Sequence, residues 1–403
     1  MSRHETIALM AALMALGALA IDAILPAIAV ISADLGVFEL SSQQLIITVV
    51  FVGMALGLLV FGPLSDTYGR RPIMFVGLVI YIVGSLCSML SESFTLMIAG
   101  RFAQGVGASC CRIITTTIIR DQFSGKAMGQ VLSLVMIIFI LVPAIAPSLG
   151  QLILMVAHWR VVFGLFVVLA IGGSIWFGLR QPETLTEKYR RAFSLRVLKD
   201  GALEALTTWS SLCYTLAAGA TFGAFIGYLS GSQQILQVLY ETGEAFPFYF
   251  GSLALAIGIS SFLNSKLVMK FDMVKLCGFS LVMVTSFSLI FLLYQWGLNE
   301  KPGLRSLLIY LGGCFFFLGT LLANFNALAL EPLGHIAGVA NSVFGSLQTL
   351  LSILLGTFIG FAYDDSVFPL TLGFLLCSLL ALVFLTIAVR TAAVRRTESG
   401  QSV

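Results

Sequence analysis

The fold of this chain is decided by the stretch Gly62-Pro63-Leu64-Ser65-Asp66-Thr67-Tyr68-Gly69-Arg70-Arg71-Pro72, a short charged segment between two long apolar runs. So short a polar connection between two membrane-length runs predicts a tight helical hairpin, and its two arginines indicate the side on which it lies. A chance basic loop would also carry arginines, but it would not need Gly62, Asp66 and Gly69 at this spacing.

The composition places the chain in the membrane class. It is 59% hydrophobic and 10% charged, whereas a soluble domain carries about 25% charged residues. Twelve apolar runs of about 20 residues, the length that spans a bilayer, predict twelve transmembrane helices, because lipid offers no water to satisfy an open backbone. The predicted fold class is therefore an all-α membrane protein.

The chain is predicted to consist of two six-helix pseudo-repeats. We expect residues 1–180 to form the N-terminal six-helix bundle, 181–206 a charged cytoplasmic linker and 207–403 the C-terminal six-helix bundle. A weaker copy of the opening stretch, from Asn264 to Met273, lies between the second and third spans of the second half. Repeats of this kind predict a substrate site at their interface, near the membrane midplane.

The distribution of Lys and Arg predicts the orientation. Of the 22 basic residues, 17 fall on the side of the N-terminus, and only Arg160, Lys301 and Arg305 fall on the other side. Because basic short loops stay in the cytoplasm, we expect both termini to be cytoplasmic. The net charge of +3 reflects this topology, so no nucleic-acid partner is expected. The first apolar run continues to Ile31, which favours a membrane span over a cleaved signal peptide.

No arrangement of reactive side chains indicates catalysis. The seven cysteines lie in apolar runs without metal-ligand spacing, and the three histidines lie in loops or tails. A nucleophile with a neighbouring base and a phosphate-binding loop are both absent from the sequence. We therefore expect no catalytic residue, no metal and no cofactor, and the chain is predicted not to be an enzyme.

Charges inside the membrane point to the functional site. Among the acids only Asp22 lies well inside a span, and Arg101 and Arg112 are the two bases within one. A charge at the bilayer centre costs about 3 kcal/mol or more, so such residues are usually functional and paired. The helical rise places Asp22 and Arg101 about 10 Å and 9 Å below the outer side. We expect them to pair; the alternative is a purely structural buried ion pair.

The fourth span carries a polar face. Arg101 and Arg112 are eleven residues apart, about 20° past three full turns, so they share a face with Gln104. Arg112 lies about 16 Å deeper than Arg101, with no acid expected beside it. The predicted substrate pocket therefore contains Asp22, Arg101, Gln104 and Arg112. For Arg112, snorkelling to the inner surface is the alternative.

Prolines mark the helices that we expect to bend. Pro26 follows Asp22 by four residues and cannot donate to its carbonyl, which predicts a kink beside the one intramembrane acid. The fifth span contains Pro143 and Pro147, with Gly150 close by. Paired prolines among small residues interrupt the hydrogen-bond ladder and allow close approach of another helix. A static kink and a moving one are both open.

Several segments resemble one family of transporters. The pattern G-x-L-x-D-x-x-G-R-R at 62–71 resembles the signature loop between helices 2 and 3 of major facilitator superfamily transporters. Residues 101–108 resemble the R-x-x-Q-G-x-G-A motif of proton-coupled drug exporters, and the double-proline span resembles their antiporter motif. Residues 22–27 and 324–348 are similar to the Bcr/CflA group of multidrug exporters.

This resemblance implies a mechanism. Two bundles would rock about a central site, with Asp22 as the proton-titrated carboxylate and Arg101 as its partner. A cytoplasmic gating motif would lock one state; its residues would be Gly62, Asp66, Gly69, Arg70, Arg71 and Asp121. The chain departs from the group's pattern at Ile24, Ala29 and Gln151, which weakens any inference about the substrate.

We therefore predict a proton-coupled antiporter of the bacterial inner (plasma) membrane, multi-pass and monomeric, that exports small, largely apolar drug-like compounds by alternating access. Its partners would be the small-molecule substrate, protons and the lipid bilayer. The first alternative is a dedicated proton-coupled transporter of one metabolite, such as an amino acid, peptide, nucleobase or siderophore. Arg112 favours this alternative, because an unpaired cation suits an anionic or zwitterionic substrate. A membrane-embedded enzyme or receptor is the remote alternative.

Overall fold

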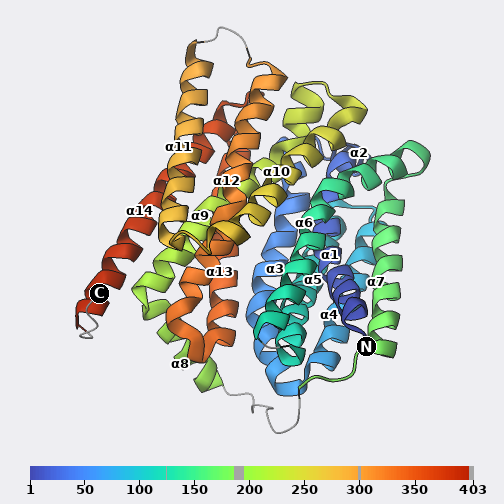
Figure 1. Ribbon diagram of the computed structural model, residues 1–403. Helices are drawn as coiled ribbons and strands as arrows, with labels where there is room; N and C mark the ends of the chain where they lie inside the picture. The colour runs from blue at the N-terminus through green and yellow to red at the C-terminus, as the bar shows by residue number, and fades with distance from the viewer. Residues whose placement is uncertain (124, 186–194, 298–300, 399–403) are drawn as a thin grey trace. The chain divides into compact units, whose positions relative to one another are not determined.

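The computed structural model describes residues 1–123, 125–185, 195–297 and 301–398. Within these ranges the regular structure is helical throughout, and twelve helices are long and apolar enough to cross a membrane (Figure 1). The predicted all-α class with twelve spans is confirmed. The chain divides into two compact units, Met1–Ser194 with Thr242–Gly251, and Leu195–Glu241 with Ser252–Val403. We call these the N-terminal unit and the C-terminal unit.

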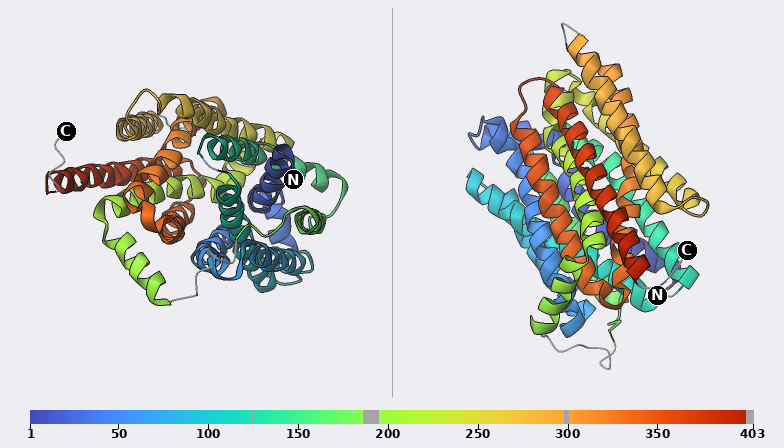
Figure 2. Two further views of the ribbon diagram at one scale, coloured as in Figure 1. Left: turned by 60° about the horizontal axis from the view of Figure 1, so that its bottom comes forward. Right: turned by 90° about the vertical axis from the view of Figure 1, so that its left-hand side faces the viewer.

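The first six spans belong to the N-terminal unit, whose helices are seen nearly end-on in the left view of Figure 2. Its first span is interrupted between Asp22 and Leu25, nearer the end of the span than its start. The elements in order are α1 (Arg3–Asp22), the 3-10 turn η1 (Leu25–Ala27), α2 (Ile28–Asp34), α3 (Leu40–Tyr68), α4 (Arg70–Met89), α5 (Phe94–Gln122), α6 (Gly125–Val156) and α7 (Arg160–Arg180).

Helix α5 lies closely against both α3 and α4 (Figure 1). Small residues make this possible: a Cβ added at Gly84 of α4 would lie 2.6 Å from the carbonyl oxygen of Gly100, and one at Gly105 would meet the backbone of Val50 in α3. Glycine at such positions lets helix backbones approach within a membrane, where packing replaces the hydrophobic effect as the main attraction. The close contacts hold α5 firmly in the unit.

Polar contacts at the two ends of the N-terminal unit show that its spans alternate in direction. At one end, Arg180 at the close of α7 donates to Glu5 near the start of α1, with Nε–Oε1 2.5 Å and Nη2–Oε2 2.8 Å. At the other end, Trp159 Nε1 donates to Asp34 Oδ2 at 2.8 Å, and Arg160 Nη2 donates to the carbonyl of Ser91 at 2.9 Å. Each end therefore gathers segments that are far apart in the sequence.

The other six spans follow after a surface helix. The elements are α8 (Leu195–Thr207), α9 (Trp209–Ser232), the π-helical turn η3 (Gln233–Leu239), the 3-10 turn η4 (Gly243–Ala245), α10 (Phe246–Leu267), α11 (Met273–Gly297), α12 (Leu304–Leu330), the 3-10 segment η5 (Glu331–Ile336), α13 (Ala337–Phe361) and α14 (Phe368–Glu398). The start of α10 clusters with the N-terminal unit, where a Cβ added at Gly251 would lie 2.6 Å from the carbonyl oxygen of Ala144 in α6.

Neutral polar pairs and aromatic rings fill the C-terminal unit. The amides of Asn264 in α10 and Asn324 in α12 bond each other twice, at 2.9 and 3.1 Å. One turn away, the hydroxyls of Ser260 and Thr320 are 3.0 Å apart. Such reciprocal amide pairs satisfy donors and acceptors inside a membrane domain without placing a charge there.

One local expectation needs correction. The predicted loop at 62–72 is almost entirely helical, because α3 continues through Pro63 to Tyr68 and α4 begins at Arg70. Within this extension, Thr67 Oγ1 donates to the carbonyl of Pro63, one turn earlier, at 3.2 Å. The turn is thus the single residue Gly69, whose φ of +104° lies in a region that L side chains rarely adopt.

The predicted linker 181–206 includes a helix, since α8 occupies its second part. At the end of α8, Thr207 Oγ1 donates to the carbonyl of Leu203, one turn earlier, at 2.8 Å. Lys188, Arg190 and Arg191, which contribute to the predicted cytoplasmic charge, lie outside the described residues. The division into two bundles at this linker stays a prediction.

Candidate functional site

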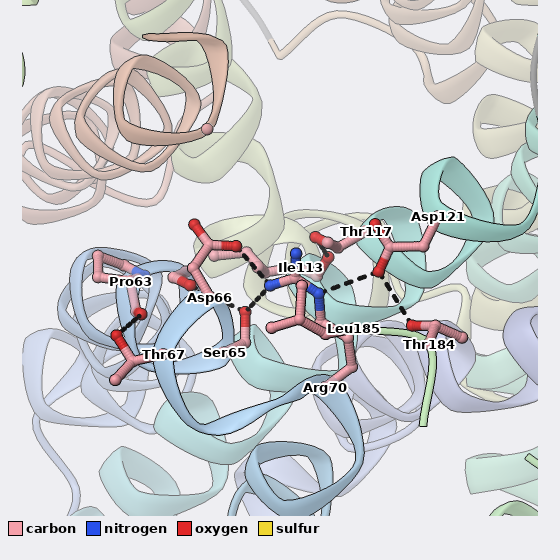
Figure 3. Close-up of polar contacts among 12 residues, drawn as sticks. Pro63, Ser65, Asp66, Thr67, Arg70, Ile113, Thr117, Asp121, Thr184 and Leu185 are labelled. Atoms are coloured by element: carbon pink, nitrogen blue, oxygen red, sulfur yellow. Dashed lines mark hydrogen bonds and ion pairs between the residues drawn. The ribbon is translucent and has the colours of Figure 1, made fainter. Parts of the chain in front are cut away.

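The hairpin between α3 and α4 holds a buried guanidinium. Arg70 is 6% exposed, and its Nη1 donates to Asp66 Oδ1 at 2.5 Å and to Ser65 Oγ at 2.8 Å. Its Nε donates to Asp121 Oδ2, at the end of α5, at 3.1 Å. Figure 3 shows these contacts, with the guanidinium lying between the ends of α3 and α5. Arg70, Asp66 and Asp121 all belong to the gating motif that the resemblance implies.

A residue beyond the sixth span completes this cluster. Glu183 accepts from the backbone N–H groups of Arg70 and Arg71, each at 3.0 Å, so its carboxylate caps the N-terminus of α4. Thr184 Oγ1 donates to Asp121 Oδ2 at 2.9 Å, next to Arg70 (Figure 3). A carboxylate at a helix N-terminus satisfies orphan donors and opposes the positive end of the helix dipole.

The environment of Glu183 favours its ionised form. Partial burial alone would raise the pKa of this carboxyl, but four backbone N–H donors, from Leu185, Arg71, Arg70 and Thr184, outweigh burial and lower the pKa below its ordinary 4.5. Glu183 is therefore an anion at neutral pH. Arg71 adds a further link, because its Nη2 donates to the carbonyl of Gly178 at 2.5 Å.

A second buried guanidinium lies within the membrane-spanning part of the unit. Arg101 is fully buried; its Nε donates to the carbonyl of Ile46 at 2.9 Å and its Nη1 to that of Ala20 at 2.7 Å. The same Nη1 donates to Gln104 Oε1 at 2.6 Å, and Gln104 in turn donates to Ser85 Oγ at 2.9 Å. Arg101, which belongs to α5, thus links this helix to α1 and α3, and Gln104 extends the hydrogen-bond network to α4.

The predicted acid lies where the first span is interrupted. Asp22 is the last residue of α1 and is 4% exposed. Pro26 sits in the first turn of η1, where its missing N–H costs nothing and its ring ends the preceding helix. The expected disruption beside Asp22 is thus a short turn and 3-10 segment between α1 and α2, within one membrane span. The carbonyl of Ala20, in the last turn of α1, receives its donor from Arg101.

Arg101 bonds the carbonyl of Ala20, two residues before Asp22, but forms no ion pair with Asp22 in this structure. The carboxylate has no hydrogen bond or ion pair with any described residue, and Nη2 of Arg101 is likewise without an acceptor. Arg101 is held by carbonyl oxygens and Gln104 instead. Their pairing therefore stays a prediction for another state of the protein.

The double-proline helix meets the same break. Helix α6 continues as one helical element through Pro143 and Pro147, so these prolines do not end it. A Cβ added at Gly150 would meet the carbonyl oxygen of Ala23, the residue after Asp22. Gly150 thus allows α6 to lie directly against the interruption in the first span, while the bending of α6 stays a prediction.

Arg112 differs from Arg101 although the two share a helix face. Its side chain is exposed, whereas that of Arg101 is fully buried. It forms no hydrogen bond or ion pair with a residue in the described part of the chain. A pocket-lining arginine and a snorkelling one are both expected to be exposed, so its role also stays a prediction.

Three members of these clusters were not predicted from the sequence. Glu183 was counted only as one charge in a linker, and its hydrogen-bond partner Arg70 lies 113 residues earlier. Ser85 and Tyr81 are neutral residues of α4; Tyr81 donates to the carbonyl of Leu16 at 2.9 Å and so also supports α1. No local pattern marks a hydroxyl that bonds to a partner on a distant helix.

The sequence matches a known family. The model of the Major Facilitator Superfamily matches residues 8–357, and the chain belongs to this superfamily. It is therefore a multi-pass membrane transporter, not an enzyme, and members of this superfamily bind small-molecule substrates. The resemblance stated for the loop at 62–71 is confirmed at the level of the family.

Bacterial relatives include proteins named for drug resistance. The chain is 26% identical to a bicyclomycin resistance protein homologue from Haemophilus influenzae, over 91% of this chain and 92% of the relative. It is 28% identical to multidrug resistance protein MdtL from a Shewanella species, over 83% of each chain. A chloramphenicol resistance protein from Pseudomonas aeruginosa is 26% identical, over 89% of this chain and 84% of the relative.

A solved structure shares the fold. The xylose transporter XylE from E. coli, in a partially occluded inward-open conformation, superposes with a TM-score of 0.72, covering 95% of this chain and 96% of XylE. The sequence identity is 10%, so this likeness concerns the fold alone.

Proposed function

We propose that this transporter is a proton-coupled antiporter that exports small, largely apolar compounds by alternating access. The observation that carries this proposal is the buried carboxylate of Asp22, which ends α1 and has no polar partner among the described residues. A carboxylate kept in such a place is costly, so a role in proton uptake and release would explain its presence. The names of the relatives support drug-like substrates.

The coupling would operate at the interruption of the first span. Loading and unloading a proton would change the charge beside Ala23, against which α6 packs through Gly150. In the ionised state Asp22 would attract Arg101, and in the protonated state Arg101 would keep its bonds to Ala20 and Ile46. Substrate and proton would then compete for one state. Each charge that crosses 100 mV contributes about 2.3 kcal/mol to transport.

The cluster around Arg70 would act as the cytoplasmic lock. Its ion pairs to Asp66 and Asp121, with the Glu183 cap, join the ends of α3, α4 and α5 to the segment after α7. Breaking such a set of charged hydrogen bonds is costly, which would make it a suitable two-state element. The basic residues predicted on this side support a cytoplasmic position in the bacterial inner membrane, with both termini inside, for a monomeric carrier.

The decisive experiment compares two acids of the first span. In proteoliposomes, Asp22→Asn should abolish substrate flux driven by a pH gradient, while the variant still inserts and binds substrate. Asp34→Asn is the matched control, since Asp34 lies at the end of the span and bonds Trp159 and His158. Unchanged flux in Asp22→Asn would rule out Asp22 as the coupling group.

A second candidate function is transport of one anionic or zwitterionic metabolite. The exposed side chain of Arg112, without a partner among the described residues, favours it. Arg112→Gln should then weaken binding of an anionic ligand more than that of a neutral one, because only the former loses a charge-assisted hydrogen bond. Equal weakening would support the snorkelling account.

A further inference from the structure

The seventh span contains a helical irregularity that the sequence does not indicate. Helix α9 passes directly into the π-helical turn η3, in which the N–H of Tyr240 donates to the carbonyl of Ile235, five residues earlier, at 3.0 Å. π-helical turns are rare and occur frequently at functional sites. The position of η3 is therefore a candidate for part of a binding site.

Three polar side chains converge on this turn without partners. Ser230 and Gln233 are 2% and 3% exposed, and Gln237 is half-buried. The Ser230 hydroxyl and Gln237 Oε1 are shielded and unbonded, and Gln233 makes no side-chain hydrogen bond with a described residue. Spacings of three and four residues bring the three onto one side of the helix. We call them the π-turn face.

These amides differ from the bonded glutamines of two other spans, although Gln151 Oε1 in α6 is likewise buried and unbonded. Gln104 bonds Arg101 and Ser85, and Gln295 in α11 donates to Thr371 at 2.8 Å. A buried polar group that lacks a partner costs roughly 1–3 kcal/mol. Leucine or methionine would avoid that cost, so the retention of these side chains implies a partner that binds transiently.

The chemistry of the partner follows from the residues present. Residues 209–239, which make up the whole span, contain no Asp, Glu, Lys, Arg or His. Each glutamine amide offers both donors and an acceptor, and a serine hydroxyl can do either. The π-turn face therefore suits neutral molecules with carbonyl, amide or hydroxyl groups, in contrast to the charged groups of the N-terminal unit.

We propose that Ser230, Gln233 and Gln237 form the subsite that hydrogen-bonds the neutral polar groups of the transported compound. The proposal rests on the export function above and names its substrate class. It assigns the recognition of neutral polar groups to the C-terminal unit, independently of Asp22.

The first test measures stability without any ligand. Gln233→Leu and Gln237→Leu should leave the Tm of the purified protein unchanged or raise it, because neither side chain bonds a described residue and Gln237 Oε1 is a shielded acceptor without a donor. Gln295→Leu is the matched control and should lower the Tm, since it removes the hydrogen bond that Gln295 donates to the Thr371 hydroxyl. A Tm decrease in the π-turn variants as large as that of the control would overturn the proposal in favour of a structural role.

The second test measures equilibrium binding to detergent-solubilised protein without a pH gradient, so a failure of proton coupling cannot affect it. Chloramphenicol is the probe with amide and hydroxyl groups, and tetraphenylphosphonium is the probe that lacks them. Each glutamine variant should bind chloramphenicol roughly 3- to 10-fold more weakly, the loss expected for one hydrogen bond, with unchanged affinity for tetraphenylphosphonium.

Three results would overturn the proposal. Unchanged affinity for both probes would mean that the face holds only water. Equal changes in the transport of both probes, without a change in affinity, would identify the turn as a hinge. A parent protein that binds tetraphenylphosphonium but no neutral amide- or hydroxyl-bearing compound, or that binds neither kind, would show that the substrate class is wrong.

Discussion

The turns between α3 and α4 and between α10 and α11 occupy corresponding places in the two halves of the sequence, yet they use polar residues differently. In the first, Arg70 is buried and bonds Asp66 and Asp121. In the second, Lys270 is exposed, and within the described residues the turn has no ion pair. Asp272 there caps its own helix, accepting from the N–H of Lys275 at 3.1 Å. A helical hairpin therefore does not need a charged cluster in order to form. This difference favours a functional role for the cluster around Arg70.

The same difference extends into the membrane-spanning parts of the units. The N-terminal unit buries Asp22 and Arg101, whereas the pairs in the C-terminal unit are neutral, as between Asn264 and Asn324. A buried charge is far costlier than a satisfied amide pair. The asymmetry supports placing proton coupling in the N-terminal unit and neutral recognition in the C-terminal unit.

The largest expected effect contrasts the two buried clusters. Arg101→Leu should lower the free energy of unfolding by about 3 kcal/mol or more, because it removes the charged donor that bonds Gln104 and the carbonyls of Ala20 and Ile46. Asn324→Leu should lower it by about 1–3 kcal/mol, since only Asn264 loses its partner. Denaturant titration of the purified proteins measures both; equal losses would contradict the special position of Arg101.

The next effect contrasts the two turns. Arg70→Gln should reduce turnover roughly tenfold or more, because it removes hydrogen bonds of a charged donor, each worth about 1.5–3 kcal/mol. Lys270→Gln, the matched change in the other turn, should leave turnover unchanged. Flux per inserted molecule in proteoliposomes is the measurement. A similar decrease in both variants would mean that the two turns are functionally equivalent.

Each unit contains a glycine at which two helices approach closely, so the same substitution can be compared in both units. Gly150→Ala and Gly319→Ala should each cost about 1–3 kcal/mol of stability, since the new methyl group would meet the backbone of Ala23 or of Ile257. Gly172→Ala, where nothing lies within 4 Å, is the control and should be neutral or slightly stabilising. We expect only Gly150→Ala to change proton-driven flux beyond its effect on stability; equal changes in flux would argue against coupling at the α1 break.

The smallest effect concerns the two carboxylate caps. Glu183→Ala and Asp272→Ala should each lower stability by about 1 kcal/mol, but only Glu183→Ala should alter turnover, because Glu183 joins two distant segments. The lowered pKa of Glu183 sets the sign of the pH effect: its contribution is present above pH 4.5 and is lost as the pH falls below that value through the lowered pKa. A parent stability that falls with acid no faster than that of Glu183→Ala would contradict this.

Much of the architecture was predictable because it depends on local composition. Twelve spans follow from the length of apolar runs, and the hairpin at Gly69 follows from a motif whose glycine must adopt positive φ. Arg70 and Asp121 could be matched through the family resemblance. The extent of helix around the motif could not, because Pro63 and the charged residues suggest a loop whereas the backbone remains helical through them.

By itself, the sequence determined the membrane class, the number of spans and the identity of the few charges that the membrane must bury, since each of these depends on the cost of transferring residues into lipid. Only the tertiary structure decided which groups meet those charges. Three contacts join residues that are far apart in the chain. Glu183 caps α4, Arg101 donates to the carbonyl of Ala20, and Gly150 approaches Ala23. Such contacts depend on how helices pack, and no local pattern of residues records the packing partner.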